Sequence, residues 1–290
     1  MTQLSPGDGQ RFLAAALHAC RRAGAIEREH FRSSRLAVEL KADDSPVTQA
    51  DRGAEEAIRE TLRRATPELG LLGEEFGHEG DRRDRWIIDP LDGTKNFVAG
   101  LPFFAVLIGL ELDGELQLGV VHAPVLGPGS GLAAVGGHGD AEVELGETWW
   151  ALRGAGAYAG TGTTPESCRQ RRLQVSQVGD LGRAFVTHGG LWLFQERELW
   201  PQFTELVARA GRTRGFGDWW GHVLVAEGRC DAMVEARVAV HDVAPIKVLV
   251  EEAGGTFLTQ QDRPLDATFG HGVISATSAL APELRRVMGY

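Results

Sequence analysis

Apolar side chains recur at helical spacing in two segments near the N-terminus. The spacing of three and four residues from Asp8 to about Phe31 predicts an amphipathic helix that Asp8 caps. Its apolar stripe consists of Phe12, Leu13, Ala16, Leu17, Cys20 and Ala23–Gly24. A polar, turn-rich connector follows at Lys41–Thr48. The helical spacing then returns from Gln49 to about Ala65 and predicts a second helix.

Short apolar runs between turn residues predict strands in the next segment. Leu69–Leu72 and Arg85–Ile88 are such runs, and acidic residues follow each of them. Phe103–Leu112 and Glu115–Val121 flank Asp113-Gly114, a dipeptide typical of a two-residue β-hairpin turn. The sequence therefore predicts strands that deliver carboxylates at their ends.

Strands and helices alternate through the rest of the chain. We expect strands at Thr148–Leu152, Ala184–Thr187, Ala232–Glu235 and Gly255–Leu258, and helices near Trp192–Ala210, Asp218–Glu227 and Val243–Ala253. The Gly-rich segment 127–147 predicts a surface loop insertion. Because no repeat or Pro/Ser-rich linker interrupts the pattern, we predict one domain over 1–290. Its N-terminal half is about 1–150 and its C-terminal half about 175–290.

The composition narrows the class of protein. The chain has 290 residues, of which 43% are hydrophobic and 24% charged, enough for a sizeable core. No apolar run approaches the length of a membrane span, and the N-terminus lacks the features of a secretory signal. Three scattered cysteines, Cys20, Cys168 and Cys230, argue against a disulfide framework. We therefore expect no membrane association and a cytoplasmic location.

The charge balance bears on possible partners. Thirty basic and 40 acidic residues give a formal net charge of −10, and no long Lys/Arg run is present. Such a chain is a poor candidate for nucleic-acid binding, so we expect no nucleic-acid partner. A phosphorylated small molecule is still compatible with this charge, because bound metal ions outweigh the global sign locally.

The segment Trp86–Phe97, WIIDPLDGTKNF, carries the strongest chemical signal. A buried apolar strand delivers Asp89 and Asp92, and Pro90 predicts that the strand ends there, because proline cannot donate to a sheet ladder. Gly93-Thr94 then opens a short helical stretch, whose free N–H groups can receive a phosphate. Carboxylates beside a phosphate cradle are the ligand set that Mg²⁺ requires.

Two further acidic segments flank this motif along the chain. Glu74-Glu75 stands at the end of the predicted strand Leu69–Leu72, before the motif. Val240-His241-Asp242 precedes a helix that ends in Glu251–Gly255. Asp242 is also a candidate N-cap for that helix, a role compatible with ligating a metal through its second oxygen.

In this order the three segments resemble the inositol monophosphatase family of magnesium-dependent phosphatases. That family's pattern is GEE, then DP-(I/L)-DGT with Asn-Phe soon after, then WD before a helix ending in EAGG. The resemblance extends from about Phe12 to Met288. It implies an α/β (α+β) fold, the layered αβαβα sandwich of the inositol monophosphatase and fructose-1,6-bisphosphatase type, and a homodimer.

The resemblance also assigns roles to residues. It implies that Glu74, Asp89, the carbonyl of Leu91, Asp92 and Asp242 bind two or three Mg²⁺ ions.

The same resemblance places other groups around the metals. Glu74, Thr94 and Asp51 would act in catalysis, with Asp51 near an additional, weaker metal and Thr94 near the attacking water. Gly93 and Thr94 would offer N–H groups to the phosphate. Lys41 precedes the SPVTxAD string as the family's lysine does, and is either near the metals or a plain surface lysine.

Within the family the chain is most similar to the histidinol-phosphatase branch. The supporting strings are Ser45–Arg52, Gly93–Phe97 and Arg212–Trp220 followed by Leu224–Gly228. Histidinol phosphate carries an ammonium and an imidazole, so a pocket that recognises it should contain carboxylates. Asp218 and Glu235 fall at the family's substrate-contact positions, although Asp218 is equally a candidate helix N-cap.

Two positions depart from the family pattern. His241 stands where the family usually has Trp, and it either perturbs packing beside Asp242 or adds a nitrogen ligand. Pro245 stands where small residues usually continue the helix, and we expect it in the first helical turn, where a missing N–H is tolerated. These changes bear on substrate preference and activity more than on metal binding.

The implied reaction is hydrolysis of a phosphate monoester by metal-activated water. Spacing argues against the haloacid-dehalogenase pattern DxDGT, because Asp89 and Asp92 are three residues apart with Pro90 between them. Inositol 1-phosphate is the second candidate substrate and a nucleotide 3′-phosphate the third. A non-catalytic binding protein of the same family is the alternative outside enzymes, but no metal-binding carboxylate of the pattern is missing.

Overall fold

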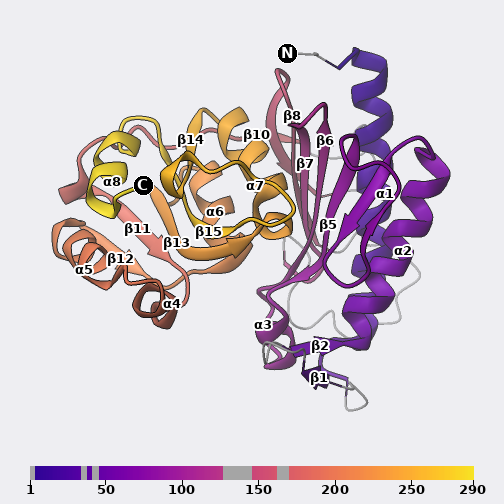
Figure 1. Cartoon of the computed structure of the whole chain (residues 1–290), viewed down its shortest axis with the longest axis horizontal. Coiled ribbons are helices and arrows are strands. Elements are labelled where there is room, and N and C mark those ends of the chain that lie inside the picture. Colours follow the sequence, from indigo (N-terminus) through magenta and orange to yellow (C-terminus); the bar gives the residue numbers. More distant parts are fainter. Residues whose placement is uncertain (1–3, 34–37, 41–45, 127–145, 162–169) are drawn as a thin grey trace.

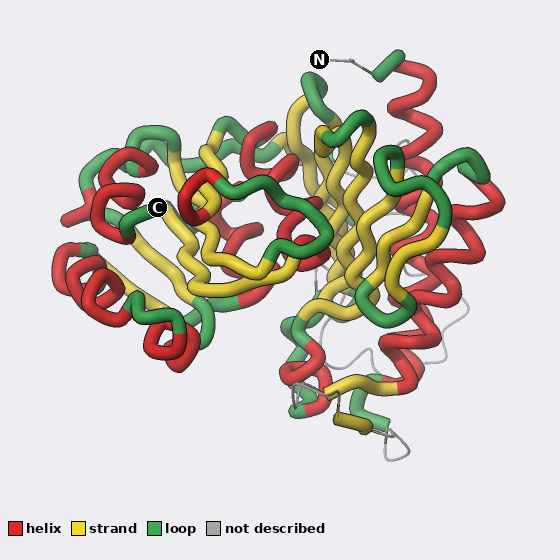
Figure 2. The backbone as a smooth tube through the Cα atoms, in the orientation of Figure 1, coloured by secondary structure: helices red, strands yellow, loops and turns green. Residues whose placement is uncertain are grey.

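A computed structural model describes residues 4–33, 38–40, 46–126, 146–161 and 170–290 (Figures 1 and 2). The helices are α1 (Pro6–His30), α2 (Gln49–Ala65), α3 (Thr94–Val98), α4 (Leu191–Glu196), α5 (Trp200–Arg209), α6 (Asp218–Ala226), α7 (Val240–Glu252) and α8 (Ala281–Met288). The strands of the N-terminal half are β1 (Val38–Leu40), β2 (Pro46–Thr48), β3 (Gly70–Gly73), β4 (Gly77–Glu79), β5 (Arg85–Asp92), β6 (Ala105–Leu112), β7 (Glu115–Ala123), β8 (Glu147–Leu152) and β9 (Gly156–Gly160). The later strands are β10 (Arg171–Arg172), β11 (Phe185–His188), β12 (Arg212–Arg214), β13 (Ala232–Ala239), β14 (Gly255–Thr259) and β15 (Gly270–Thr277).

A large sheet of eight strands organises the N-terminal half. Its order is β10-β9-β8-β7-β6-β5-β3-β4, and α1 and α2 cover one of its faces (Figure 1). Side chains of β5 alternate between the two faces: Trp86 and Ile88 pack toward α1 and α2, whereas Ile87 packs on the opposite side. Both faces of this sheet are therefore buried.

A smaller sheet organises the C-terminal half. Its order is β12-β11-β13-β15-β14, and α4, α5 and α8 pack on its outer side. Helices α6 and α7 lie between the two sheets, where α7 contacts β6, β7 and β8 on one side and β14 on the other (Figure 2). The layers are thus helices, sheet, helices, sheet, helices. The predicted αβαβα sandwich is confirmed.

Helix α7 lies very close to the large sheet. Gly109 and Gly119 are paired across β6 and β7, and a Cβ at Gly119 would lie 2.1 Å from the carbonyl oxygen of Pro245. Only glycine admits this approach. Pro245 is the sixth residue of α7, so our expectation that it lies in the first turn is wrong, yet the helix continues to Glu252. Pro245 has no N–H and therefore removes one backbone hydrogen bond of α7, and packing against Gly109 and Gly119 supports the helix at this point.

The structure corrects two expectations near the functional motifs. Strand β5 does not end at Pro90 but continues to Asp92, with a shift of register between Asp89 and Asp92 opposite β6. Proline is tolerated there because the extra residue of the bulge interrupts the ladder. At the start of α1 the N-cap is Ser5, whose hydroxyl accepts a hydrogen bond from the N–H of Asp8.

Several elements lie beyond the sequence predictions. Strand β15 and helix α8 complete the small sheet and its outer layer without having been predicted. Most of the predicted 127–147 loop and Lys41 lie outside the described residues. Within the described ranges no helix combines the length and apolar character needed to cross a bilayer.

Candidate active site

Four carboxylates converge where the two halves of the chain meet. The bulge in β5 lets Asp89 and Asp92 approach one site, although residues three apart on a regular strand point to opposite faces. Glu74 follows β3, the neighbour of β5, and its N–H donates to the carbonyl of Ile88 at 3.2 Å. Asp242 arrives from α7, and its carboxyl group lies within hydrogen-bonding reach of that of Asp89.

Asp242 is the third residue of α7 and not its N-cap. Its Oδ2 accepts a hydrogen bond from the N–H of Ala239 at 2.7 Å, which satisfies the helix end from inside the first turn. The other oxygen, Oδ1, faces Nε2 of His241 at 3.2 Å. One carboxylate therefore stabilises the helix start with Oδ2, from the third helical position and not from the predicted N-cap position, while Oδ1 lies beside His241.

Burial and neighbouring negative charges raise the pKa values of Asp89 and Asp92. Burial, and then the charge of Glu74 foremost, raises the pKa of Asp89 well above its usual range. Burial and the charges of Asp218 and Asp242 do the same for the pKa of Asp92. Like charges held together in this way are unfavourable unless a cation compensates them.

Hard oxygen donors at close range fit a divalent metal ion. Asp89 is 2% exposed, and its Oδ1 accepts the N–H of Leu91 at 3.0 Å, which fixes the orientation of the carboxylate. Ligand atoms of Glu74, Asp89 and His241 all lie within 4.8 Å of one another. The carboxylates suit Mg²⁺, which takes oxygen ligands in an octahedron and keeps some of its waters.

Thr94 and Asp51 form a hydrogen-bonded pair beside these carboxylates. The Thr94 hydroxyl lies 3.0 Å from Asp51 Oδ1 and 3.0 Å from the carbonyl oxygen of Leu91. Asp51 Oδ2 is already held by Thr48, whose N–H and hydroxyl lie at 2.7 and 2.6 Å. Burial raises the pKa of Asp51, while these hydrogen bonds oppose the rise. Asp51 is therefore fixed in orientation, with Oδ1 aimed at Thr94.

The segment after β5 forms a backbone cradle. Gly93 has a φ of 91°, and a Cβ there would lie 2.6 Å from the carbonyl oxygen of Phe103. Glycine is therefore required for the chain to turn from β5 into α3. The N–H groups at the start of α3 have no partner within the helix and can face an anion beside the carboxylates.

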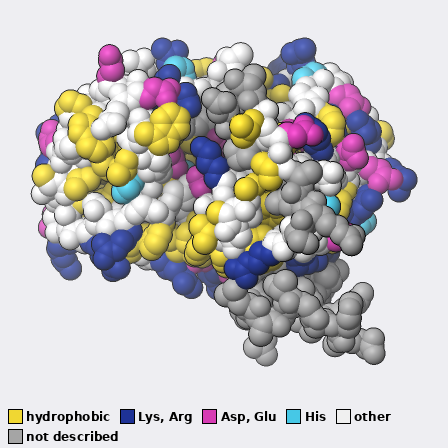
Figure 3. Space-filling model, turned by 90° about the horizontal axis from the view of Figure 1, so that it is seen from below, with side chains coloured by type: hydrophobic (Ala, Val, Ile, Leu, Met, Phe, Trp, Pro, Cys, Tyr) yellow, Lys and Arg dark blue, Asp and Glu magenta, His cyan; other side chains and the backbone are white. Residues whose placement is uncertain are grey.

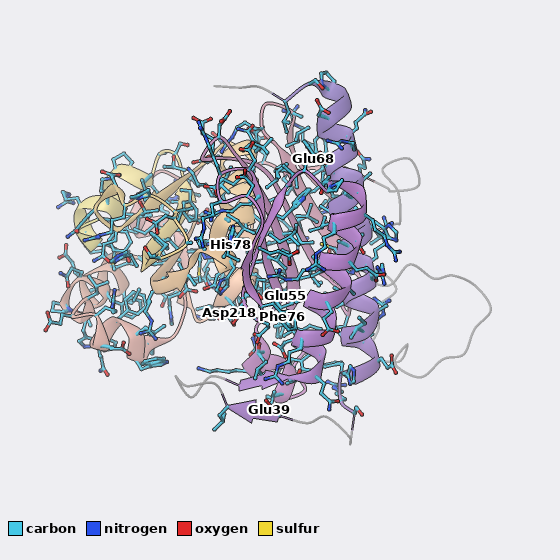
Figure 4. All side chains as sticks on the ribbon, turned by 45° about the vertical axis from the view of Figure 1, so that its right-hand side comes forward. Glu39, Glu55, Glu68, Phe76, His78 and Asp218 are labelled. Carbon is cyan, nitrogen blue, oxygen red and sulfur yellow. The ribbon has the colours of Figure 1, made fainter. Side chains whose placement is uncertain are left out.

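Asp218 and Glu235 adjoin the same site from the C-terminal half. They line a cavity of 110 Å³ together with Asp92 and Asp242, and Figure 4 shows Asp218 at the junction of the halves. Glu235 is 4% exposed, and its Oε1 accepts the N–H of Asp218 at 3.2 Å. Asp218 is not an N-cap but the first residue of α6, and its side chain accepts a hydrogen bond from Asn96 at 3.1 Å.

Two residues outside the predicted site, His222 and Trp219, also line this cavity. His222 lines it, and Nδ1 of its buried ring lies 2.8 Å from the hydroxyl of Ser275. Burial lowers the pKa of His222 to about 3, so the ring is neutral. The N–H of Trp219 binds Asp92 Oδ2 at 2.9 Å and ties α6 to β5. His222 begins the apolar run HVLVA of α6. Such a run predicts core packing and does not indicate that its histidine lines a pocket.

Comparison with known proteins places this geometry in a family. The model of the inositol monophosphatase family matches residues 8–288. A histidinol-phosphatase of Streptomyces coelicolor is 38% identical over 246 residues, which cover 83% of this chain and 84% of that protein. A histidinol-phosphatase of Chlorobaculum parvum is 35% identical over 284 residues and 96% of each chain. The crystal structure of the suhB protein of Bartonella henselae superposes with a TM-score of 0.78 at 28% identity, covering 96% of this chain and 98% of that one.

Proposed function

Since the chain belongs to the inositol monophosphatase family and is a phosphomonoesterase, we propose that it hydrolyses histidinol phosphate. The observation that carries the substrate proposal is the pair of carboxylates, Glu235 and Asp218, in the cavity beside Asp92. An ammonium and an imidazole are complementary to carboxylates, and the four carboxylates of this lining outnumber its one arginine, Arg237. The two histidinol-phosphatases similar to this chain support the same substrate.

We propose Glu74, Asp89, Asp92, Asp242 and the carbonyl of Leu91 as the residues that hold two or three Mg²⁺ ions. The family is magnesium-dependent in general, and the buried, mutually repelling carboxylates fit that requirement. When bound, the ions activate water and neutralise charge on the phosphoryl oxygens and the leaving alkoxide. We also propose a cytoplasmic location, in line with the free, buried thiols of Cys20 and Cys230. A homodimer is proposed on the family resemblance alone.

The chain's own residues orient the attacking water. Thr94 donates its hydroxyl proton to Asp51 Oδ1, so the lone pairs of the hydroxyl are free to accept a hydrogen bond from water. As the water oxygen bonds to phosphorus and the ester P–O bond breaks, the water proton passes to Thr94 and the Thr94 proton to Asp51. The leaving alkoxide takes a proton from solvent water to become the alcohol, and Asp51 then returns its proton to solvent. N–H groups at Gly93 and Thr94 hold the phosphoryl oxygens in place.

Glu235→Gln tests the basis of substrate choice. We expect kcat/KM for histidinol phosphate to fall about 10–100-fold, because a hydrogen bond to a charged group contributes about 1.5–3 kcal/mol. A polyol phosphate, which needs only a hydrogen-bond acceptor there, should lose much less. Glu205→Gln removes an exposed charge from the Glu205–Arg209 pair at 3.1 Å, outside the lining of the cavity, and is the control. Equal losses on both substrates for Glu235→Gln would count against the role of its charge.

His241→Gln tests whether this unusual residue is a ligand. The 3.2 Å separation of His241 Nε2 and Asp242 Oδ1 equals roughly the distance between adjacent ligands around one octahedral metal ion. Nitrogen ligands favour Mn²⁺ over Mg²⁺. If His241 is a ligand, we expect the ratio of Mn²⁺ to Mg²⁺ affinity to fall about fivefold in the variant. An unchanged ratio in calorimetric titrations would leave His241 as a hydrogen-bond partner of Asp242 alone.

A further inference from the structure

Helix α2 presents three charged side chains at intervals of one helical turn. Asp51, Glu55 and Arg59 are four residues apart, so they share a face of the helix. All three are buried, with exposed fractions of 1%, 0% and 4%. Only the first belongs to the reaction proposed above. A buried ion pair contributes little net stability, so Glu55 and Arg59 require another explanation.

Glu55 holds the backbone that follows Glu74. Its Oε2 accepts the N–H of Glu75 at 2.7 Å, and its Oε1 accepts the N–H of Phe76 at 3.3 Å. Figure 4 shows Glu55 and Phe76 next to each other between α2 and the large sheet. One carboxylate of α2 thus fixes two consecutive N–H groups of the turn between β3 and β4.

Arg59 completes the support. Its Nε donates to Glu55 Oε1 at 2.7 Å, its Nη2 to the carbonyl of Gly77, and its Nη1 to Glu79 at 3.2 Å. The turn is pressed against this pair, because a Cβ at Gly73 would lie 1.9 Å from Glu55 Oε1. The backbone on both sides of Glu74 is therefore held by side chains of α2.

We propose that Glu55 and Arg59 are positioning residues that set the metal affinity of the site by fixing Glu74 relative to the Asp51–Thr94 pair. Asp51 and Glu55 lie on the same helix, α2. The position of Glu74, which Glu55 holds, is therefore fixed relative to Asp51, which orients Thr94 and the attacking water. Residues that orient a ligand typically change metal affinity 10–100-fold when they are replaced. The inference rests on the proposed role of Glu74 as a metal ligand.

Glu55→Gln on the full, metal-stripped chain is the test. Gln offers one oxygen in place of two, so its NH₂ group must face one of the N–H donors of the turn or of Arg59. We expect Mg²⁺ affinity, measured by titration calorimetry, to fall about tenfold. The matched control is Glu111→Gln, which breaks the buried Arg85–Glu111 pair, also 2.7 Å long, in the same half of the chain. It should lower the melting temperature similarly and leave the affinity unchanged.

A double-mutant cycle with Glu74→Gln separates positioning from general destabilisation. If Glu55 acts through Glu74, Glu55→Gln should weaken Mg²⁺ binding in the wild type and have no further effect in the Glu74→Gln background. Where Glu55→Gln does not fold, Arg59→Lys, which retains the charge but cannot reach both Glu55 and Gly77, replaces it in the cycle. A loss of stability with wild-type Mg²⁺ affinity, or full additivity, would overturn the inference. Unchanged affinity in Glu74→Gln itself would instead overturn the proposed metal site.

Discussion

Asp89→Asn is expected to lower Mg²⁺-dependent phosphate release at least about 10³-fold, since metal-based stabilisation of the transition state is worth several kcal/mol. Asp89 is the most buried of the four carboxylates, at 2% exposed, and contacts Asp242. Burial, and then the charge of Glu74, raises its pKa. An amide offers the metal ion a neutral oxygen, so one positive charge of the bound metal is no longer balanced by a carboxylate. The measurement is the initial rate of phosphate release at saturating substrate.

The Asp89→Asn variant should lose activity without losing thermal stability in its metal-free form. Without metal, Asp89→Asn relieves repulsion among buried carboxylates, so the apo variant should melt no lower than the apo wild type. Mg²⁺ at about 100 times its Kd should stabilise the wild type by about 2.7 kcal/mol, or roughly 5 °C, and the variant far less.

Asp231→Asn is the matched control for this prediction. Asp231 is a buried carboxylate that accepts the N–H of Phe185 at 2.7 Å. It precedes β13, whereas Asp242 follows the other end of that strand. Its replacement should reduce stability and leave the thermal shift by Mg²⁺ intact. A wild-type Mg²⁺ shift in Asp89→Asn would contradict the assignment of Asp89 as a ligand.

Thr94→Val is expected to reduce kcat by about 10²–10⁴-fold, the usual contribution of a positioned proton-transfer group. Valine has nearly the shape of threonine but lacks the hydroxyl that lies 3.0 Å from Asp51 Oδ1. Substrate binding should change little, because the N–H groups of the cradle are retained. The effect should therefore appear in kcat rather than in KM.

Thr94→Ser provides the matched comparison. Serine restores the hydroxyl without the methyl group, so most of the activity should return. If Thr94→Val retained more than about a tenth of the wild-type kcat, far above the loss expected for a proton-transfer group, the Thr94–Asp51 pair would not orient the nucleophile. A serine variant as inactive as the valine variant would point to packing of the methyl group instead.

The part of the site that lies close together along the chain was predictable from residue chemistry. Asp89, Asp92 and the Gly93-Thr94 cradle fall within six residues, so a strand followed by a turn suffices to bring them together. The expected end of the strand at Pro90 was wrong, because the bulge depends on pairing with β6. A bulge is a feature of two paired strands, so the apolar pattern of β5 alone does not indicate it.

Contacts between distant segments were accessible only through the family resemblance. Nothing in the helical pattern of α2 indicates that Asp51 meets Thr94, 43 residues away. Glu55 and Arg59 look like ordinary charged helix positions, and their burial against the turn between β3 and β4 is a tertiary contact that the helical pattern does not show. By contrast, Pro282 near the start of α8 is a helix-start signal that could have revealed that helix.

The most direct test is phosphate release by the purified chain from histidinol phosphate, inositol 1-phosphate and adenosine 3′,5′-bisphosphate, each with Mg²⁺ and with chelator. We expect turnover that requires Mg²⁺ and a preference of more than about tenfold for histidinol phosphate, equivalent to about 1.4 kcal/mol of transition-state discrimination. Preference for another ester would retain the mechanism and refute the proposed substrate. Undiminished turnover in chelator, or none of any ester with Mg²⁺ bound, would contradict the proposed reaction itself.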